Sequence, residues 1–387
     1  MYTTKRLTNE VQSMRFIQTI VRFAGVTALM LATIASLTVA PAVAQQAATP
    51  ASISCEPSIA SAVQRAGTPV TAPEAPGDLT SVKMGFVPVS IFAPVFVGKE
   101  KGYFAEEGID LALEPFPGGA DPVVLTASGQ LDLAIGGAGP AFWNAVAQGL
   151  PITVIAPGHA EGNPVATPLM ISAEKCRSGE ITSIADLEGK RVSVNAPGAT
   201  EYWLNSALST GGLTINDIEL QALAFPDAVA ALQAGAIDAA MVGEPLATKA
   251  EQDGIAVRLA TDFPVYDVQP TLIYANDGWL EENPELAEGF ATGYMRAVID
   301  MSENGFTDPT NLSIIEQYTG VPAELIAASV PPVYAVDGVV NAGSLLKLQS
   351  FFRERDFLRY EEDLDPASFI DQQYINSAMA ELNPNQP

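Results

Sequence analysis

LTASGQLDLAIGGAGP, the stretch from Leu125 to Pro140, contains a helix end, a short strand and the start of another helix. A helix is expected to end at Gly129, and the apolar residues 131–135 predict a strand. Glycines follow, and Pro140 suits a first helical turn, where the N–H that proline lacks would be unpaired anyway. The unit therefore points free backbone N–H groups beyond the strand end.

A second copy of this unit, ALQAGAIDAAMVGEP, lies at Ala231–Pro245. The matching positions are Gly129 and Gly235, Leu131 and Ile237, Asp132 and Asp238, Ala134 and Ala240, and Gly137 and Gly243. Two such units in one chain predict two similar lobes that face one another.

The composition is that of a globular protein with a large core. The chain has 387 residues, of which 48% are hydrophobic and 17% are charged, so two domains of ordinary size are expected. The net charge of −26 would repel a polyanion, and nucleic acid is therefore not an expected partner. We interpret the charge as a solvated acidic surface.

The N-terminus has the pattern of an export signal. Basic residues precede the apolar run Phe23–Ala40, and Ala42–Ala44 supplies small residues suited to cleavage near Ala44. Met14 would serve equally well as the start. We predict a signal peptide at 1–44, a flexible tail at 45–79 and a periplasmic protein. No later stretch reaches the roughly 18 apolar residues that a membrane span requires.

The chain contains two cysteines, Cys55 and Cys176. Export permits a disulfide between them, but the sequence does not show that they meet, so a bond and two free thiols both remain open. No metal site and no cofactor are predicted, because His159 is the only histidine and no spaced cluster of ligands accompanies it.

Alternating strand and helix patterns predict an α/β fold with parallel sheets. Leu169–Ser172 is expected to be a strand leaving the first lobe, and Thr271–Ala275 the strand returning to it. The pattern after Asp277 is helical. The predicted organisation is the first part of lobe one at 80–170, lobe two at 171–273 and a mostly helical second part of lobe one at 274–387.

Several motifs in a fixed order give the chain a family resemblance. They are Gly102–Ile109, Phe116–Gly119, Leu125–Gly137, Ile184–Val192, Asn195–Gly198, Ala230–Thr248 and Asn283–Leu286. From about Val82 to Ala380 the sequence resembles the extracytoplasmic substrate-binding proteins of nitrate/sulfonate/taurine-type ABC importers.

This resemblance implies a type II bilobal periplasmic-binding-protein fold, with two α/β lobes joined by two crossing strands. It further implies a monomer without catalytic activity that closes on a small solute and presents it to an ABC permease in the inner membrane. The solute stays open, because the family spans nitrate, sulfonates, taurine, bicarbonate, pyrimidines and other small molecules.

Candidate site residues follow from the rule that ligands lie beyond the carboxyl ends of the strands in open α/β sheets. In lobe one they are Ser90, Ile91, Gly137, Ala138, Gly139, His159 and Glu161. In lobe two they are Gly198, Ala199, Thr200, Glu201 and Glu244. Two of the segments, 137–139 and 198–200, open helices and could hold an oxygen from opposite sides, although ordinary turn chemistry would also explain their glycines.

Individual side chains leave alternatives open. His159 could contact the ligand, act as a pH-sensitive latch or lie on the surface. Glu244 could cap a helix or reach the cleft, and Glu201 is favoured in a first helical turn by the helix dipole. No Arg or Lys falls at the strand-end loops. We therefore expect a zwitterionic, heterocyclic or weakly charged solute.

Three function classes fit these patterns. A solute receptor for an ABC importer is the leading hypothesis. An enzyme on the same fold, of the pyrimidine-precursor synthase or dehydratase type, is the alternative, although no Cys or Ser–His pair appears at the site loops. A sensor that reports its ligand to a membrane kinase would need a partner chain.

Overall fold

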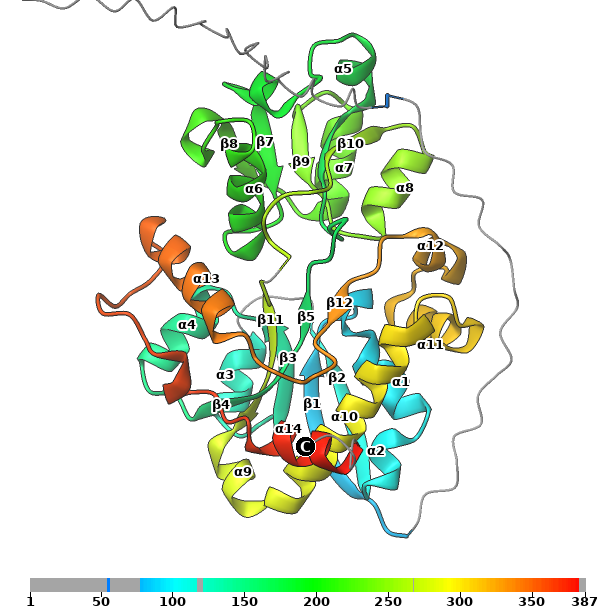
Figure 1. Cartoon of the computed structure of the whole chain (residues 1–387), viewed down its shortest axis with the longest axis vertical. Helices are drawn as coiled ribbons and strands as arrows, with labels where there is room; N and C mark the ends of the chain where they lie inside the picture. Colours follow the sequence, from blue (N-terminus) through cyan, green and yellow to red (C-terminus); the bar gives the residue numbers. More distant parts are fainter. Residues whose placement is uncertain (1–53, 56–76, 117–120, 267, 383–387) are drawn as a thin grey trace, which may run out of the picture. The chain divides into compact units, whose positions relative to one another are not determined.

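The computed structural model describes residues 54–55, 77–116, 121–266 and 268–382 (Figure 1). The predicted signal peptide at 1–44 and most of the predicted tail at 45–79 lie outside the described residues. Within the described part, no helix has the length and apolar character needed to cross a membrane.

The first sheet has five strands in the order β2-β1-β3-β11-β4 (Figure 1). They are β1 (Thr80–Phe86), β2 (Ile109–Pro115), β3 (Leu133–Gly137), β4 (Ile152–Pro157) and β11 (Thr271–Asn276). Its two faces bury different side chains. In β11, Ile273 packs in the core that contains Phe96 and Phe290, whereas Tyr274 packs in the core that contains Phe142. Alternation along the strands therefore gives this sheet a helix layer on each face.

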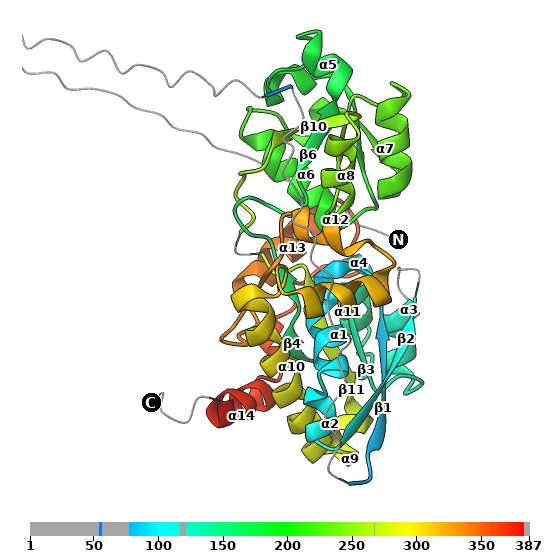
Figure 2. The ribbon, with the colours of Figure 1, turned by 90° about the vertical axis from the view of Figure 1, so that its right-hand side faces the viewer.

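The second sheet also has five strands, in the order β10-β6-β9-β7-β8. They are β6 (Leu169–Ser172), β7 (Arg191–Val194), β8 (Glu219–Ala222), β9 (Ala239–Met241) and β10 (Ala256–Ala260). One face packs against α7 (Phe225–Gln233) and α8 (Leu246–Gln252), and the other against α6 (Ala199–Ser209) (Figure 2). The edge strand β10 was not among the predicted strands.

The prediction of parallel sheets is wrong for the strands that receive the chain from the other sheet. β11 is antiparallel to β3 and β4, and β6 is antiparallel to β9 and β10. The chain enters each sheet where the parallel strands end, since Thr271 pairs with Gly137 and Leu169 pairs with Met241. A strand that starts at that edge must run opposite to its neighbours. The predicted lobe limits, at 170/171 and 273/274, fall inside these two strands and stay a prediction.

The repeated unit occurs once in each sheet. α3 (Asp121–Ala127) is followed by Gly129 with φ 72°, and α7 is followed by Gly235 with φ 68°. Glycine suits both positions because this left-handed backbone is strained for other residues. Each unit continues into an inner strand of its sheet, β3 or β9, and then into α4 (Pro140–Ala147) or α8. Two similar lobes are therefore confirmed.

The C-terminal part is largely helical and packs on the first lobe, as predicted. Its helices are α9 (Asp277–Glu282), α10 (Pro284–Asn304), α11 (Pro309–Thr319), α12 (Ala323–Ala328), α13 (Ala342–Glu354) and α14 (Gln373–Leu382). α10 contacts α1 (Ala93–Glu100), α2 (Tyr103–Glu106) and α14. A two-residue strand, β12 (Val333–Tyr334), pairs with β5 (His159–Ala160) and ties this part to the first passage between the sheets.

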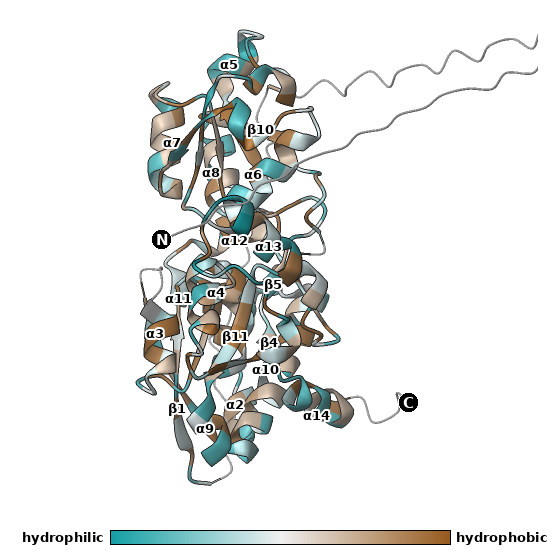
Figure 3. Ribbon diagram, turned by 90° about the vertical axis from the view of Figure 1, so that its left-hand side faces the viewer, coloured by the Kyte–Doolittle hydropathy of each residue, from teal (hydrophilic) through white to brown (hydrophobic). Residues whose placement is uncertain are grey.

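The two cysteines form a disulfide, Cys55–Cys176, with a Cα–Cα distance of 5.6 Å. Cys176 belongs to α5 (Ala173–Arg177), which follows β6, so the bond holds residue 55 to the second lobe (Figure 1). Colouring by hydropathy shows hydrophobic residues on β11 of the first lobe and hydrophilic residues on α5 (Figure 3).

Candidate functional site

A cavity of about 830 Å³ lies at the carboxyl ends of the parallel strands of the first sheet. We call it the cleft cavity. Its lining comes from the loop after β1, from β3 and the first turn of α4, from Asn195 and Pro197 after β7, and from the segment that follows α13. Residues of both sheets and of the C-terminal part therefore share one space.

Two helix starts, one from each lobe, face each other beside this cavity. Gly139 is the N-cap of α4 and Gly198 is the N-cap of α6. A Cβ built on Gly198 would lie 3.8 Å from Cδ of Pro140, so the two turns are in close approach. The first turn of each helix leaves backbone N–H groups without intrahelical partners, and these turns favour negative charge. The arrangement suits an oxygen-bearing group held between the lobes.

The predicted residues of these turns differ in their access to the cavity. Gly137 and Gly139 line it, whereas Ala138 does not. The Ala138 N–H donates to the Pro270 carbonyl at 2.8 Å, and its carbonyl accepts from the indole N–H of Trp143 at 3.1 Å. Ala138 thus has both backbone groups occupied. The N–H groups at the start of α4 are backbone donors in the lining that have no intrahelical partner.

The predicted turn of the second lobe lies just beyond the cavity wall. Gly198, Ala199 and Thr200 directly follow Pro197, which lines the cavity, but they are not themselves part of its lining. The Thr200 hydroxyl donates to the side-chain oxygen of Asn195, which fixes Asn195 at the cavity wall.

A basic side chain lines the cleft cavity although none falls at the strand-end loops. Arg359 lines the cleft cavity, together with Asp356 and Phe357. The Asn144 side chain of α4 holds this segment, because its oxygen accepts the Arg359 N–H at 2.7 Å and its amide donates to the Phe357 carbonyl at 3.0 Å. The strand-end rule considers only residues that follow strands, so it missed a cation delivered from the end of α13.

A second cavity of about 560 Å³ adjoins the first, and the two share Val89, Ile91 and Phe225 in their linings. We call it the side cavity. The segment from Thr319 at the end of α11, through α12, to Pro332 forms one of its walls. The predicted residues that line it are Ser90, Ile91, His159 and Glu244, and Lys249 of α8 also lines it.

His159 is held in one orientation by Thr271. The Thr271 hydroxyl oxygen accepts the His159 backbone N–H at 2.8 Å and lies 2.7 Å from Nδ1. If the hydroxyl gives its single hydrogen to Nδ1, the ring carries its own hydrogen on Nε2. Burial lowers the pKa of His159 to about 3, so the ring is neutral at physiological pH. His159 is 6% exposed and not a surface residue.

Gly158 makes this contact possible. A Cβ at Gly158 would lie 2.2 Å from the Thr271 hydroxyl oxygen and 2.9 Å from its carbonyl carbon. Any larger residue would force β11 away from the loop. Glycine at 158 therefore allows the close contact between His159 and Thr271.

The three predicted carboxylates all have protein partners. Glu161 accepts the Ala166 N–H at 2.6 Å and the indole N–H of Trp203 at 2.8 Å, and burial raises its pKa. Glu201 forms an ion pair with Arg355 at the end of α13. Glu244 accepts from Arg258 at 2.7 Å and caps α8. Only Glu244 of the three lines a cavity, and its oxygens are already engaged.

Sequence reasoning also missed Tyr274, which lies inside β11 and lines the cleft cavity. The strand-end rule passes over residues within strands, so no sequence signal selected it. Across the described residues, no group of three or more His, Cys, Asp or Glu side chains is arranged to hold a metal ion.

The chain is similar to known proteins over most of its described part. The family model described as NMT1/THI5 like matches residues 90–305. The nitrate/nitrite binding protein of a Nostoc species is 23% identical over 253 residues, covering 61% of this chain and 58% of that protein. The taurine-binding periplasmic protein of Escherichia coli is 29% identical over 239 residues, covering 59% of this chain and 70% of that protein. The chain thus spans little more than half the length of the nitrate/nitrite binding protein.

Solved structures show the same fold. The alkanesulfonate-binding protein of Xanthomonas axonopodis pv. citri has a TM-score of 0.59 at 17% identity, covering 77% of this chain and 100% of that one. The periplasmic nitrate-binding protein of Synechocystis has a TM-score of 0.62 at 18% identity, covering 81% of this chain and 90% of that one. These matches confirm the bilobal periplasmic-binding-protein fold. Since the family model covers more than half of the chain, the protein belongs to the NMT1/THI5-like family, the nitrate/sulfonate/taurine group of substrate-binding proteins that its sequence resembles.

Proposed function

We propose that the protein is an extracytoplasmic receptor that binds a small organic or inorganic solute in the cleft and delivers it to an ABC importer. The observation that carries this proposal is the cleft cavity, which is lined from both sheets and flanked by the facing starts of α4 and α6. The names of relatives support it, since they include binding proteins for nitrate/nitrite, bicarbonate and taurine.

Closure of the two lobes around the solute would be the working step. Polar contacts join α6 of the second lobe to other parts of the chain: among them, Glu201 pairs with Arg355, and Trp203 donates to Glu161 in the first passage between the sheets. These contacts hold the lobes in the arrangement described. A solute that adds contacts to both lobes would shift an equilibrium between open and closed forms toward the closed one.

We propose direct solute contact for the predicted residues that line a cavity, namely Ser90, Ile91, Gly137, Gly139, His159 and Glu244. The other predicted residues would shape the cleft walls: Ala138, Glu161, Thr200 and Glu201 through the partners described above, and Gly198 and Ala199 as the turn that begins α6. This division follows from which of the predicted residues line one of the two cavities.

An enzyme on this fold is less well supported. Ser90 and His159 line the same cavity, but no hydrogen bond joins them in the described structure. A histidine with a pKa of about 3 is also a weak general base. The two cysteines are bonded to each other, so neither supplies a nucleophile.

Location and partners are part of the same proposal. The export pattern at 1–44 and the periplasmic relatives support a periplasmic protein, acting as a monomer with a permease in the inner membrane. The net charge of −26 argues against nucleic acid as a partner.

A solute screen on the mature protein tests the proposal. Residues 45–387 would be purified with the disulfide intact and heated with nitrate, bicarbonate, taurine, alkanesulfonates, dicarboxylates, amino acids and pyrimidines. A stabilising compound should bind one-to-one by calorimetry, compact the protein in small-angle X-ray scattering and be recovered unchanged by mass spectrometry. Conversion of that compound to a product would contradict the receptor, as would a panel in which nothing binds.

A further inference from the structure

Tyr274 is a buried residue whose hydroxyl has no protein partner among the described residues. The residue is 1% exposed, and its ring packs against Phe142 of α4 with centroids 5.7 Å apart. No residue of the described chain forms a hydrogen bond with the hydroxyl, although it lines the cleft cavity. Other buried tyrosines have partners: Tyr294 donates to the Pro157 carbonyl at 2.8 Å and Tyr334 to the Ile91 carbonyl at 3.2 Å. Because the phenol of a largely buried tyrosine normally finds an acceptor, and Tyr274 lines the cavity, a group bound in the cavity can supply that acceptor.

Gly136 leaves the room that this hydroxyl occupies. A Cβ at Gly136 would lie 3.0 Å from the Tyr274 hydroxyl oxygen and 3.6 Å from the neighbouring ring carbon. A side chain there would push the hydroxyl from its place over β3. Glycine at 136 therefore leaves space for the Tyr274 hydroxyl, and both Gly136 and Gly137 line the cavity.

The surroundings of the hydroxyl define the chemistry of its partner. Burial raises the pKa of Tyr274, so the phenol stays protonated and acts as a donor. The same cavity is lined by Ala141 and Phe142 in the first turn of α4, whose N–H groups are also donors, and by Arg359. Asp356 is the one carboxylate among the described lining residues. This set of donors fits an oxygen acceptor, and a negatively charged one best.

We infer that the Tyr274 hydroxyl is a solute-binding hydrogen-bond donor that takes an oxygen of an anionic group, of the carboxylate, sulfonate or nitrate type, on the solute. The inference rests on the proposed receptor function and names the residue that orients the solute in the cleft. It narrows the expected zwitterionic, heterocyclic or weakly charged solute to one that carries an anionic group.

A matched pair of variants tests this role, Tyr274→Phe and Tyr294→Phe. Each removes one buried hydroxyl, but only that of Tyr294 has a protein acceptor. Tyr274→Phe should leave the melting temperature of the solute-free protein unchanged or raised, and should weaken binding about 10- to 100-fold. Tyr294→Phe should lower the melting temperature and leave affinity near that of the wild type. The probe is whichever of nitrate, taurine and methanesulfonate binds the wild-type protein most tightly.

A double-mutant cycle tests the contact with Gly136. Gly136→Ala should lower stability and affinity in the wild-type background, because its Cβ meets the hydroxyl. In the Tyr274→Phe background the nearest atom is gone, so the same substitution should lower stability less. Purely additive effects in the cycle would overturn the assigned geometry.

The outcomes separate this inference from the proposed function. Unchanged affinity in Tyr274→Phe would overturn the inference and leave the receptor standing. A melting temperature lowered as much as in Tyr294→Phe would also overturn it, because the hydroxyl would then have an internal partner. Failure of the wild-type protein to bind any probe would count against both the receptor and an anionic solute. The melting temperatures of the two variants would still show whether the Tyr274 hydroxyl has an internal partner.

Discussion

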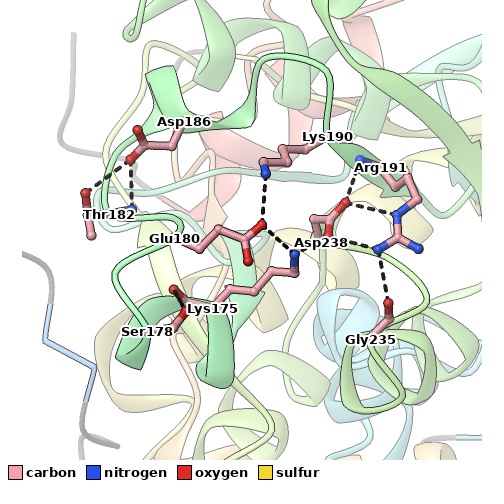
Figure 4. Close-up of polar contacts among 9 residues, drawn as sticks. All are labelled: Lys175, Ser178, Glu180, Thr182, Asp186, Lys190, Arg191, Gly235 and Asp238. Carbon is pink, nitrogen blue, oxygen red and sulfur yellow. Dashed lines mark hydrogen bonds and ion pairs between the residues drawn. The ribbon is translucent and has the colours of Figure 1, made fainter.

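Asp238 accepts the backbone N–H of Arg191 at 2.9 Å, and its own N–H donates to the Arg191 carbonyl at 2.8 Å (Figure 4). Asp132 makes the same two contacts with Lys83, at 2.8 and 3.0 Å. The two aspartates occupy matching positions of the repeated unit. In each lobe the unit therefore brings a carboxylate that fixes the strand next to its own.

The two aspartates should differ in their contribution to stability. Asp238 also accepts from the Arg191 guanidinium at 3.0 Å and from Lys175 at 2.8 Å, and its side chain is 5% exposed (Figure 4). Burial opposes ionisation, but the hydrogen bonds from Arg191 and Lys175 outweigh it and lower the pKa of Asp238. We expect Asp238→Asn to cost about 3 kcal/mol of unfolding free energy and Asp132→Asn about 1 kcal/mol, measured by urea unfolding. Equal losses of unfolding free energy in the two variants would show that the side chains of Arg191 and Lys175 contribute nothing.

Gly137 provides a test of the cavity wall. A Cβ there would meet nothing closer than 3.8 Å, so Gly137→Ala should fold and bind almost normally. Gly137→Leu should extend into the cleft cavity and weaken solute binding at least tenfold, with a melting temperature close to that of the alanine variant. Calorimetric titration of both variants measures the effect. Unchanged affinity in the leucine variant would remove this turn from the binding site.

His159 should make the protein less stable in acid. Its pKa is about 3 in the folded protein and 6.5 ordinarily, so below pH 6.5 the unfolded chain takes up a proton that the folded one does not. Stability is then lost as pH falls from about 6.5 toward 3, by about 2 kcal/mol at pH 5. Urea unfolding of wild type and His159→Asn between pH 7 and 4 isolates this contribution. The difference between the two proteins should change with pH, and a constant difference would contradict the buried neutral ring.

The ion pair between Glu201 and Arg355 joins α6 to the end of α13. The Glu201 side chain is 2% exposed and that of Arg355 is 29% exposed, so removing the arginine leaves a buried carboxylate without its cation. Arg355→Ala should lower the unfolding free energy by about 3 kcal/mol. The double variant Glu201→Gln/Arg355→Ala should recover part of this loss, because no charge then remains buried. A double variant less stable than Arg355→Ala would contradict the argument.

Local chemistry made much of the fold predictable. Gly129, Gly235 and Pro140 mark helix ends and starts through their own backbone preferences, and the structure has these boundaries where the sequence predicts them. The strand predicted at Leu169–Ser172 has the limits of β6. These features depend on a few consecutive residues, so the sequence carries them directly.

Features that depend on distant contacts escaped prediction. β5 and β12 have two residues each and pair across a long separation, which no periodicity reveals. Arg359 reaches the cleft only because Asn144 holds the segment after α13. The Tyr274 hydroxyl can occupy its position only because Gly136, on the neighbouring strand β3, has no side chain. In each case the deciding partner is remote in sequence.

The disulfide gives the chain a covalent ring. Cys55 precedes the first strand of lobe one, Cys176 follows the first strand of lobe two, and 121 positions separate them. The first passage between the sheets, after His159 and before Leu169, lies inside this ring. A protease that cut there would produce two polypeptides. On a denaturing gel they would migrate as one species until a reducing agent is added. The first part of lobe one would thus stay covalently attached to lobe two through sulfur, while the second passage still joins lobe two to the C-terminal part by backbone.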